Sequence, residues 1–260
     1  MTIGSMFRYI RILILLFILV IVAMYTWLSD LRSTGWDEPL WMVIYPINGD
    51  GSKKTTRYIN YLKEKTFSQI ETFVAEEADY FNIKINTPLQ VKLAPTVLDI
   101  PPAPPKNGNI LKVMLWSLNI RYWAYQHNSF IGPSPDIKIF VVYYDPGSTP
   151  QLAHSLGLKK GKLGIVNAYA SRLYNQKNNV VITHELLHTI GATDKYSLEN
   201  GYPIFPQGYA KPDKKPLYPQ ELAEIMGARI PLSETTMIMP NSLNQTLVGT
   251  ATAGEIGWAE

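Results

Sequence analysis

The sequence predicts an α+β fold that follows an N-terminal membrane-spanning helix. An uncharged apolar run lies close to the N-terminus, and behind it short apolar segments typical of strands alternate with longer segments of helical periodicity. The final part of the chain is rich in Pro and Gly and is typical of loops. With 260 residues, of which 46% are hydrophobic, the chain has room for one good-sized domain and an appendage.

The apolar run over residues 12–28 is about long enough to cross a bilayer as a helix. Arg8 and Arg11 precede it, whereas an acidic bias follows it. The positive-inside rule therefore predicts a cytoplasmic N-terminus over residues 1–11, a single-pass membrane anchor, and a main domain on the extracytoplasmic side, either periplasmic or extracellular. A cleaved signal peptide is the alternative, although the run is long for one and lacks a clear small-x-small cleavage site.

Behind a short stalk over residues 29–39, the main domain is expected over residues 40–260. Apolar and β-branched runs predict strands at residues 40–47, 89–93, 137–144 and 163–170, the last of them at the edge of a sheet. Apolar residues at helical spacing predict helices at residues 55–81 and 110–125, with shorter helices after Pro219 and over residues 252–258. This order of elements favours the α+β class.

Charge and composition exclude several functions. The 24 basic and 21 acidic residues give a net charge of +3, and no basic cluster exceeds short pairs such as Lys159-Lys160. A nucleic-acid partner is therefore not expected. The absence of cysteine excludes disulfides, Cys-ligated zinc and a thiol nucleophile.

The sequence T-H-E-L-L-H-T-I-G-A-T-D-K-Y, which begins at Thr183, carries the strongest chemical signal in the chain. His184 and His188 are four residues apart, so on a helix they project from one face and can bind one metal ion. Gly191 is a natural left-handed helix terminator, and it can turn the chain so that Asp194 meets the same ion. Three protein ligands with one open position are typical of a catalytic zinc site.

Glu185 lies beside the first histidine and is placed to hold a water on the metal. The sequence V-V-I precedes the motif and leucines fill its two variable positions, which predicts a helix with one buried apolar face and one face that carries His, Glu and His. An amphipathic helix with two surface histidines is the alternative. That alternative does not account for Gly191 and Asp194 at the spacing that closes the ligand shell.

The pattern H-E-x-x-H-x-x-G-x-x-D resembles the zincin metallopeptidases, and more specifically the metzincin clan. Most metzincins have His as the last ligand. The snapalysin-like members have Asp there with an aromatic residue shortly after it, as in Asp194 and Tyr196. The resemblance implies one zinc ion per chain, held by His184, His188 and Asp194, with zinc favoured over manganese or iron by the ligand types.

The resemblance also implies a two-lobed catalytic domain, with an upper lobe over residues 40–191 and a loop-rich lower lobe over residues 192–260. In a zincin upper lobe a mixed sheet lies with backing and active-site helices, and an edge strand lines the cleft and can pair with an extended peptide substrate. The sequence A-E-I-M-G-A resembles the Met-containing turn that metzincins place beneath the metal, with Met226 as its methionine. A second candidate for this turn is M-I-M-P, with Met239.

Two acidic residues compete with Asp194 for the place of third ligand. Gluzincins take this ligand from a Glu on a downstream helix, and Glu221 or Glu224 would lie on such a helix here. Asp194 is preferred because a glycine-mediated turn brings it near the ion with little chain to order. His127 and His154 lie in or beside predicted loops and are interpreted as surface residues.

These observations predict a membrane-anchored zinc endopeptidase. Glu185 would accept a proton from the attacking water and return it to the leaving amine, as a general base and then a general acid. Tyr196 is a candidate donor to the oxyanion, with a packed tyrosine as the alternative. Two other classes stay open: a metal-binding scaffold without turnover, and a zinc amidase that acts on cell-wall material.

Overall fold

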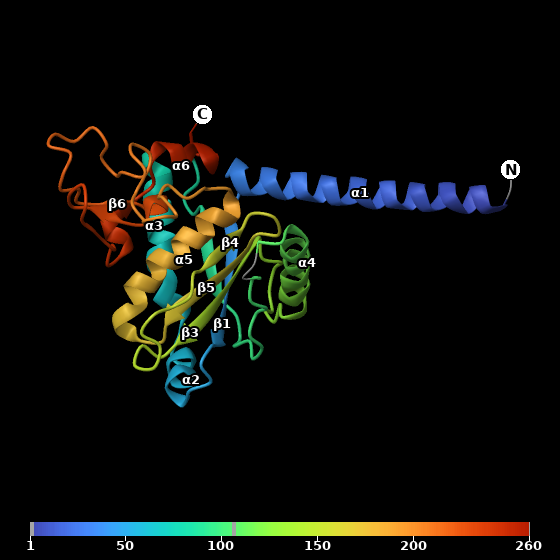
Figure 1. Cartoon of the computed structure of the whole chain (residues 1–260), viewed down its shortest axis with the longest axis horizontal. Coiled ribbons are helices and arrows are strands. Elements are labelled where there is room, and N and C mark those ends of the chain that lie inside the picture. The colour runs from blue at the N-terminus through green and yellow to red at the C-terminus, as the bar shows by residue number, and fades with distance from the viewer. Residues whose placement is uncertain (1–2, 106–107, 260) are drawn as a thin grey trace.

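A mixed five-stranded sheet forms the centre of the structure, a computed structural model that describes residues 3–105 and 108–259 (Figure 1). Its strands are β1 (Leu40–Asn48), β2 (Leu89–Leu93), β3 (Ile137–Tyr144), β4 (Leu156–Leu158) and β5 (Leu163–Tyr169). They lie in the order β2-β1-β3-β5-β4. All neighbours pair in parallel except β4, which is antiparallel to β5. The structure therefore confirms the α+β class with a mixed sheet.

Helices cover both faces of this sheet. The helices of the main domain are α2 (Lys53–Asn60), α3 (Ser68–Tyr80), α4 (Ile110–Gln126), α5 (Asn175–Ile190) and α6 (Thr250–Glu255). Short 3-10 helices lie at η1 (Glu64–Phe67), η2 (Arg172–Tyr174), η3 (Ile225–Gly227) and η4 (Leu243–Gln245). The C-terminal part adds two small sheets, β6–β9 and β7–β8, formed by β6 (Ala223–Glu224), β7 (Ile230–Pro231), β8 (Met237–Ile238) and β9 (Thr246–Leu247).

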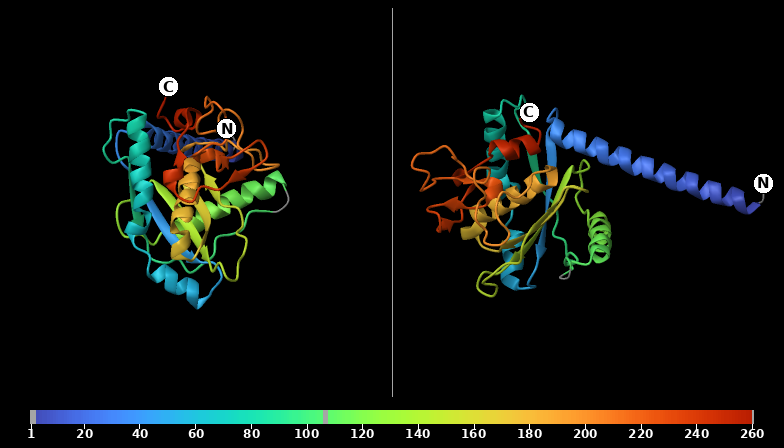
Figure 2. Two further views of the ribbon diagram at one scale, coloured as in Figure 1. Left: turned by 90° about the vertical axis from the view of Figure 1, so that its left-hand side faces the viewer. Right: turned by 45° about the horizontal axis from the view of Figure 1, so that its top comes forward.

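The sheet is buried on both faces, so successive side chains of a strand point into two separate hydrophobic cores. On one face Met42 and Ile44 of β1 belong to the cluster formed with α3 and α5. On the other face Val43 and Tyr45 belong to the cluster that includes α4. Figure 2 shows α4 alone on its side of the sheet and α3 and α5 on the opposite side. The sheet thus places α5, which carries His184 and His188, between itself and the C-terminal part of the chain.

The first element, α1 (Ile3–Gly35), is a single helix that projects from the body (Figure 1). Its segment Phe7–Gly35 contains an 18-residue window with a mean hydropathy of 2.7, of which 0% is buried against the rest of the protein. The helix is therefore long and apolar enough to span a membrane.

Within residues 29–39, where the sequence predicts a stalk, α1 continues as far as Gly35 and is fastened to the body. Lys162 donates from Nζ to Ser33 Oγ at 2.7 Å and forms an ion pair with Asp30 at 3.0 Å. Trp36 is buried and donates from Nε1 to the Ile256 carbonyl oxygen at 2.7 Å. These contacts join residues that are far apart in the chain, so no periodic pattern in the sequence predicts them.

The single helix predicted over residues 55–81 is wrong, since the structure divides it into α2, η1 and α3. The break comes at Lys63, whose backbone is extended. Thr66 closes the new turn, because its Oγ1 accepts from the Lys63 N–H at 3.3 Å and its N–H donates to the Lys63 carbonyl at 2.8 Å. Tyr61 and Tyr80, which contribute to the apolar spacing behind this prediction, are 62% and 76% exposed.

Two further expectations are corrected. The predicted edge strand is β5, but β4 lies outside it and forms the edge. The short helix expected directly after Pro219 is replaced by the strand β6 and the 3-10 helix η3. The Glu224 carboxylate caps η3 by accepting from the Gly227 N–H at 2.7 Å, which folds this segment as a tight turn. The final helix exists as α6, displaced two residues toward the N-terminus of its predicted start.

Candidate metal centre

The helix α5 holds the motif against the sheet and ends where the sequence predicts. Leu186 and Leu187 are buried in the core below the helix. Gly191 ends it with φ 122°, and the N–H groups of Gly191 and Ala192 both donate to the Leu187 carbonyl, at 3.1 and 3.0 Å. Only glycine adopts this conformation readily, so Gly191 directs the chain back toward the site.

The structure brings His184, His188 and Asp194 together. The two Nε2 atoms are 3.1 Å apart, and Asp194 Oδ1 lies 3.2 Å from His184 Nε2 and 3.1 Å from His188 Nε2. Ligands about 2.0–2.1 Å from a tetrahedral zinc lie about 3.3 Å from one another. The three atoms therefore form a nearly equilateral triangle of a size that one metal ion fits.

The other nitrogen of each imidazole is bound to a backbone carbonyl. His184 Nδ1 lies 2.9 Å from the Ile225 oxygen, and His188 Nδ1 lies 2.8 Å from the Ala192 oxygen. A carbonyl oxygen can only accept, so each Nδ1 carries the proton and each Nε2 can offer its lone pair. Metal-binding histidines are oriented in this way in proteins. The tautomers that the carbonyls select are those that a metal requires.

Burial and the neighbouring charges shift the pKa values of the group. Burial raises the pKa of Asp194, but its contacts with His184 and His188 outweigh that effect and lower it, so the carboxylate stays ionised. Burial lowers the pKa of His188, yet Asp194 and the Ala192 carbonyl raise it above its usual value overall. As the pH falls, protons therefore begin to compete with a metal for His188 at a higher pH than they would for a free imidazole.

Glu185 lies beside this triangle and is only 6% exposed. Its Oε2 is buried and has no hydrogen-bond partner among the residues that the structure describes. Burial raises the pKa of Glu185, and the nearby His184 and His188 oppose that shift. A buried carboxylate oxygen without a partner is costly, and a water held next to the metal ligands would satisfy it.

The edge strand β4 lies directly against the motif. At Gly157, the middle residue of β4, an added Cβ would lie 2.5 Å from His188 Cβ and 2.6 Å from the Glu185 carbonyl oxygen. The close approach of strand and helix therefore requires glycine at this position. Sequence reasoning missed Gly157, although a glycine between two leucines in a short apolar segment is a signal for such an approach.

The loop that carries Asp194 is fixed by a second unpredicted group, in which Glu255 of α6 is central. Its carboxylate accepts from the Thr193 N–H at 2.8 Å and from the Thr193 hydroxyl at 2.6 Å. Lys195, 4% exposed, forms an ion pair with the same carboxylate at 2.7 Å. The residues on both sides of Asp194 are thus held by Glu255, which lies too far along the chain for any spacing rule to identify.

Met226 lies in η3 and is fully buried. The residue before it, Ile225, binds His184, and the Met226 carbonyl accepts from the Lys195 N–H at 2.9 Å. The turn that contains Met226 therefore contacts both ends of the motif. Met239 is 44% exposed and lies just beyond β8.

The competing acidic residues are engaged elsewhere. Glu224 is fully buried, and its carboxylate accepts from the Gly227 and Gly249 N–H groups and from the Thr252 hydroxyl. Glu221 is exposed and pairs with two surface lysines. Among the described residues that could hold a metal ion, the structure assembles His184, His188 and Asp194 as a group.

Tyr196 borders the candidate metal centre, whereas His127 and His154 lie outside it. The Tyr196 ring centroid is 6.3 Å from that of His184, and burial together with Asp194 raises the pKa of Tyr196 to about 12. Tyr196 is therefore a protonated phenol at the border of the site. His127 binds Asp99 and the Trp123 carbonyl, and His154 is exposed, so neither joins the group.

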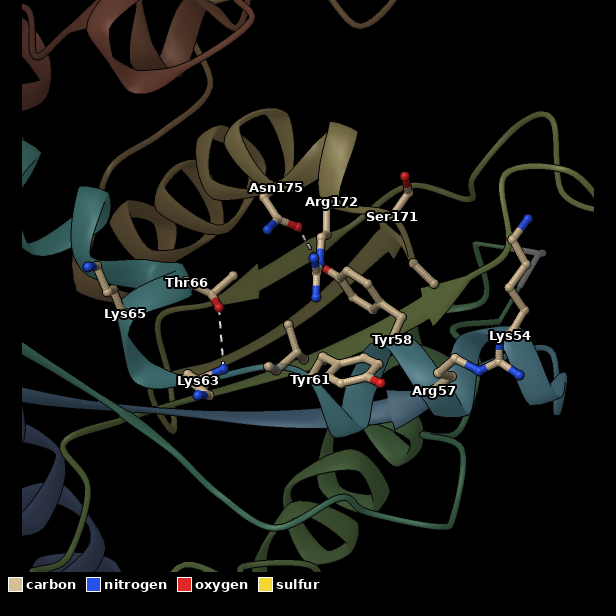
Figure 3. A pocket seen from close by; sticks show the side chains of 12 residues that line it. Lys54, Arg57, Tyr58, Tyr61, Lys63, Lys65, Thr66, Ser171, Arg172 and Asn175 are labelled. Carbon is tan, nitrogen blue, oxygen red and sulfur yellow. Dashed lines mark hydrogen bonds between the residues drawn. The ribbon is translucent and has the colours of Figure 1, made fainter.

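A surface pocket lies at the opposite, N-terminal end of α5 and is lined by several basic side chains (Figure 3). Arg172 lies over the Tyr61 ring there, 5.5 Å from its centroid, and Tyr58 donates to Asn175 at 2.7 Å. The candidate metal centre lies near the C-terminal end of the same helix, so this pocket is a separate feature.

No protein-family model matches the chain, and no curated protein matches it. The site itself therefore defines the class: a partly buried His-His-Asp group that could hold a metal ion, in an α+β domain with an N-terminal helix capable of spanning a membrane.

Proposed function

We propose that the chain is a membrane-anchored zinc-dependent endopeptidase of the zincin type, similar to the metzincins. The observation that carries this proposal is the buried Oε2 of Glu185, which has no partner among the described residues and belongs to a side chain whose pKa is affected by the charges of His184, His188 and Asp194. A purely structural metal site has no use for such a carboxylate. Two imidazole nitrogens and one carboxylate oxygen suit zinc and leave a fourth position open.

His184, His188 and Asp194 would hold the zinc ion. The ion would supply Lewis acidity, which lowers the pKa of a water and polarises the carbonyl of the scissile bond. Glu185 accepts the proton of the attacking water at its carboxylate and returns it to the leaving amine. Its raised pKa suits this role, because a carboxylate that binds protons more strongly is a better base near neutral pH. Tyr196, protonated at neutral pH, is the candidate donor to the oxyanion.

The proposed substrate is a peptide in extended conformation. The strand β4 pairs with β5 on one side, and it lies against the motif through Gly157. A peptide that adds to the outer edge of β4 would have its backbone fixed beside Glu185. In this proposal residues 40–191 form the upper lobe, residues 192–260 form the lower lobe, and the turn at Met226 supports the metal from below.

Digestion of a peptide library by the full chain in detergent micelles tests the activity. We expect internal cleavages that stop when a chelator removes the metal and return when one equivalent of zinc is added. A parallel incubation with cell-wall material serves as the comparison. Cleavage of cell-wall amides alone would make the protein a zinc amidase. A protein that binds zinc and cleaves neither substrate would be a metal-binding scaffold, and the endopeptidase proposal would be wrong.

We further propose that α1 anchors the protein with the catalytic domain outside the cytoplasm, because Arg8 and Arg11 precede its apolar segment. A reporter enzyme that works only outside the cytoplasm, fused after residue 260, is expected to be active. Alkaline extraction should leave the protein in the membrane fraction. Activity of a reporter that works only in the cytoplasm would contradict the orientation, and release at alkaline pH would contradict the anchor.

A further inference from the structure

The helix α4 has two apolar faces, and the sheet covers one of them. Ile120 and Ala124 are buried against the cluster that contains Val43 and Phe140. The opposite face carries a row of exposed apolar side chains, here called the α4 stripe: Leu111 (65% exposed), Met114 (59%), Leu115 (67%), Leu118 (65%), Tyr122 (60%) and Tyr125 (76%). Their positions, most of them three or four residues apart, place them on one side of the helix.

Polar residues border the α4 stripe. Lys112, Asn119 and Gln126 follow one another at intervals of seven residues along one margin, and Arg121 lies on the other. An exposed row of large apolar residues with a polar margin is typical of a surface that contacts a membrane or a protein. A lone exposed leucine needs no explanation, whereas six large apolar side chains on one exposed face do.

The α4 stripe lies on the side of the body from which α1 projects. In Figures 1 and 2, α4 is on this side of the sheet and its axis runs across the direction of α1. A turn between β4 and β5 links the two helices. Arg121 of α4 donates to the Lys160 carbonyl oxygen at 3.0 Å, and Lys160 lines a pocket with Tyr25 and Thr26 of α1.

This pocket carries an excess of positive charge. Lys138, Lys159 and Lys160 line it. Its acidic residues are neutralised within the fold, since Asp30 pairs with Lys162 and Asp136 pairs with Arg32. Basic side chains beside a membrane-spanning helix are attracted to lipid phosphates.

Tyr25 and Trp27 of α1 are 75% and 62% exposed, and they lie where the apolar segment of the helix ends. Aromatic residues at the end of a membrane-spanning helix mark the level of the lipid headgroups. Tyr25 lines the same pocket as Lys160, and Lys160 contacts α4. The part of α1 at the level of the lipid headgroups therefore lies beside the face of the body that carries α4.

We propose that α4 is a second membrane contact, which lies along the bilayer surface and buries the α4 stripe at the boundary between headgroups and acyl chains. The occupant of this face is the phospholipid of the bilayer that α1 crosses, and the lysines of the adjoining pocket bind its phosphates. This inference rests on the membrane anchor of the proposed function and is independent of the metal centre. The bilayer is the favoured occupant because contacts of Ser33 and Trp36 fasten α1 to the body and hold this face toward it.

The absence of cysteine in the chain allows a direct test, since one introduced cysteine can be labelled alone. The full chain with Leu118→Cys carries an environment-sensitive fluorophore and is reconstituted in vesicles of phosphatidylcholine and phosphatidylglycerol. Leu16→Cys in the apolar segment of α1 is the positive control. Leu173→Cys, at a leucine that is 91% exposed in η2, is the matched negative control. A second stripe variant, Leu115→Cys, repeats the measurement should Leu118→Cys fold poorly.

We expect lipids with a nitroxide on the acyl chain to quench the label at position 118 several-fold more than at position 173. Quenching at position 16 without quenching at positions 118 and 115 would overturn the docking of α4 while the anchor stands. Lack of quenching at position 16 would overturn the anchor and the docking together. A label at position 118 that is shielded from aqueous iodide yet not quenched by lipid would make a second copy the occupant and overturn the proposal.

Discussion

Replacing Glu185 with Gln is expected to leave the metal content near the wild-type level while turnover falls by about 10²–10⁴-fold, the range usual for loss of a general base. The amide keeps the shape of the side chain but cannot accept a proton. Glu185 is not one of the three residues that could hold a metal ion, so we expect the three candidate ligands to stay in place in this variant. Metal analysis and kcat on a cleaved peptide measure the two effects separately.

The matched control is Glu221→Gln, which makes the same chemical change at an exposed carboxylate paired with Lys211 and Lys214. We expect this variant to retain wild-type turnover and metal content. Full activity of Glu185→Gln would remove this carboxylate from the mechanism. Loss of the metal along with activity would instead make Glu185 part of the binding site.

Replacing His184 with Ala is expected to abolish stoichiometric zinc binding. The change removes one of three ligand atoms that lie 3.1–3.2 Å apart and leaves the Ile225 carbonyl without its partner. Asp194→Ala should have the same consequence, because two imidazoles alone leave the ion weakly held. Metal per chain, measured after dialysis against zinc-free buffer, checks both variants. His127→Ala is the control, since this histidine lies outside the group and should leave the metal content unchanged.

The same measurement decides between Asp194 and Glu224. Glu224→Gln turns one of the two carboxylate oxygens into an NH2 group that cannot accept, so either the Gly227 N–H or the Gly249 N–H is left without its acceptor. This should cost about 1–3 kcal/mol of folding stability. We expect this variant to unfold at a lower temperature and to bind zinc in full when folded. If Glu224→Gln empties the site while Asp194→Ala does not, the third ligand is Glu224 and the assignment to Asp194 is wrong.

Elements that depend on local pattern are predicted well from this sequence. The strands β1, β2 and β3 are continuous apolar runs, as expected of strands buried on both faces, and their predicted bounds agree with the structure to within a residue. The proximity of His184, His188 and Asp194, which could hold a metal ion, is predicted for a similar reason. A spacing of four residues on a helix and a glycine after it determine where the two histidines point and where the chain turns.

The features that were missed depend on contacts between distant parts of the chain. The break at Lys63 follows from a local turn closed by Thr66, which competes with the helical pattern on either side. The three-residue β4 is too short for any periodicity, so β5 was expected at the edge. Glu255 holds the loop around Asp194 from about sixty residues away, and only the fold brings the two segments together.

In the proposed membrane-anchored peptidase, the fastening of α1 to the body would determine how the protein searches for a substrate. A domain on a flexible tether sweeps a hemisphere above the membrane and reaches targets at many heights. Here Asp30 and Trp36 bind directly to the body, so the anchor and the domain turn as one object. The candidate metal centre would then be held at a constant height above the membrane, and lateral diffusion would bring it to its targets. Peptide bonds at that one height above the membrane would be cleaved, while the same sequence placed higher or lower on a target would be spared.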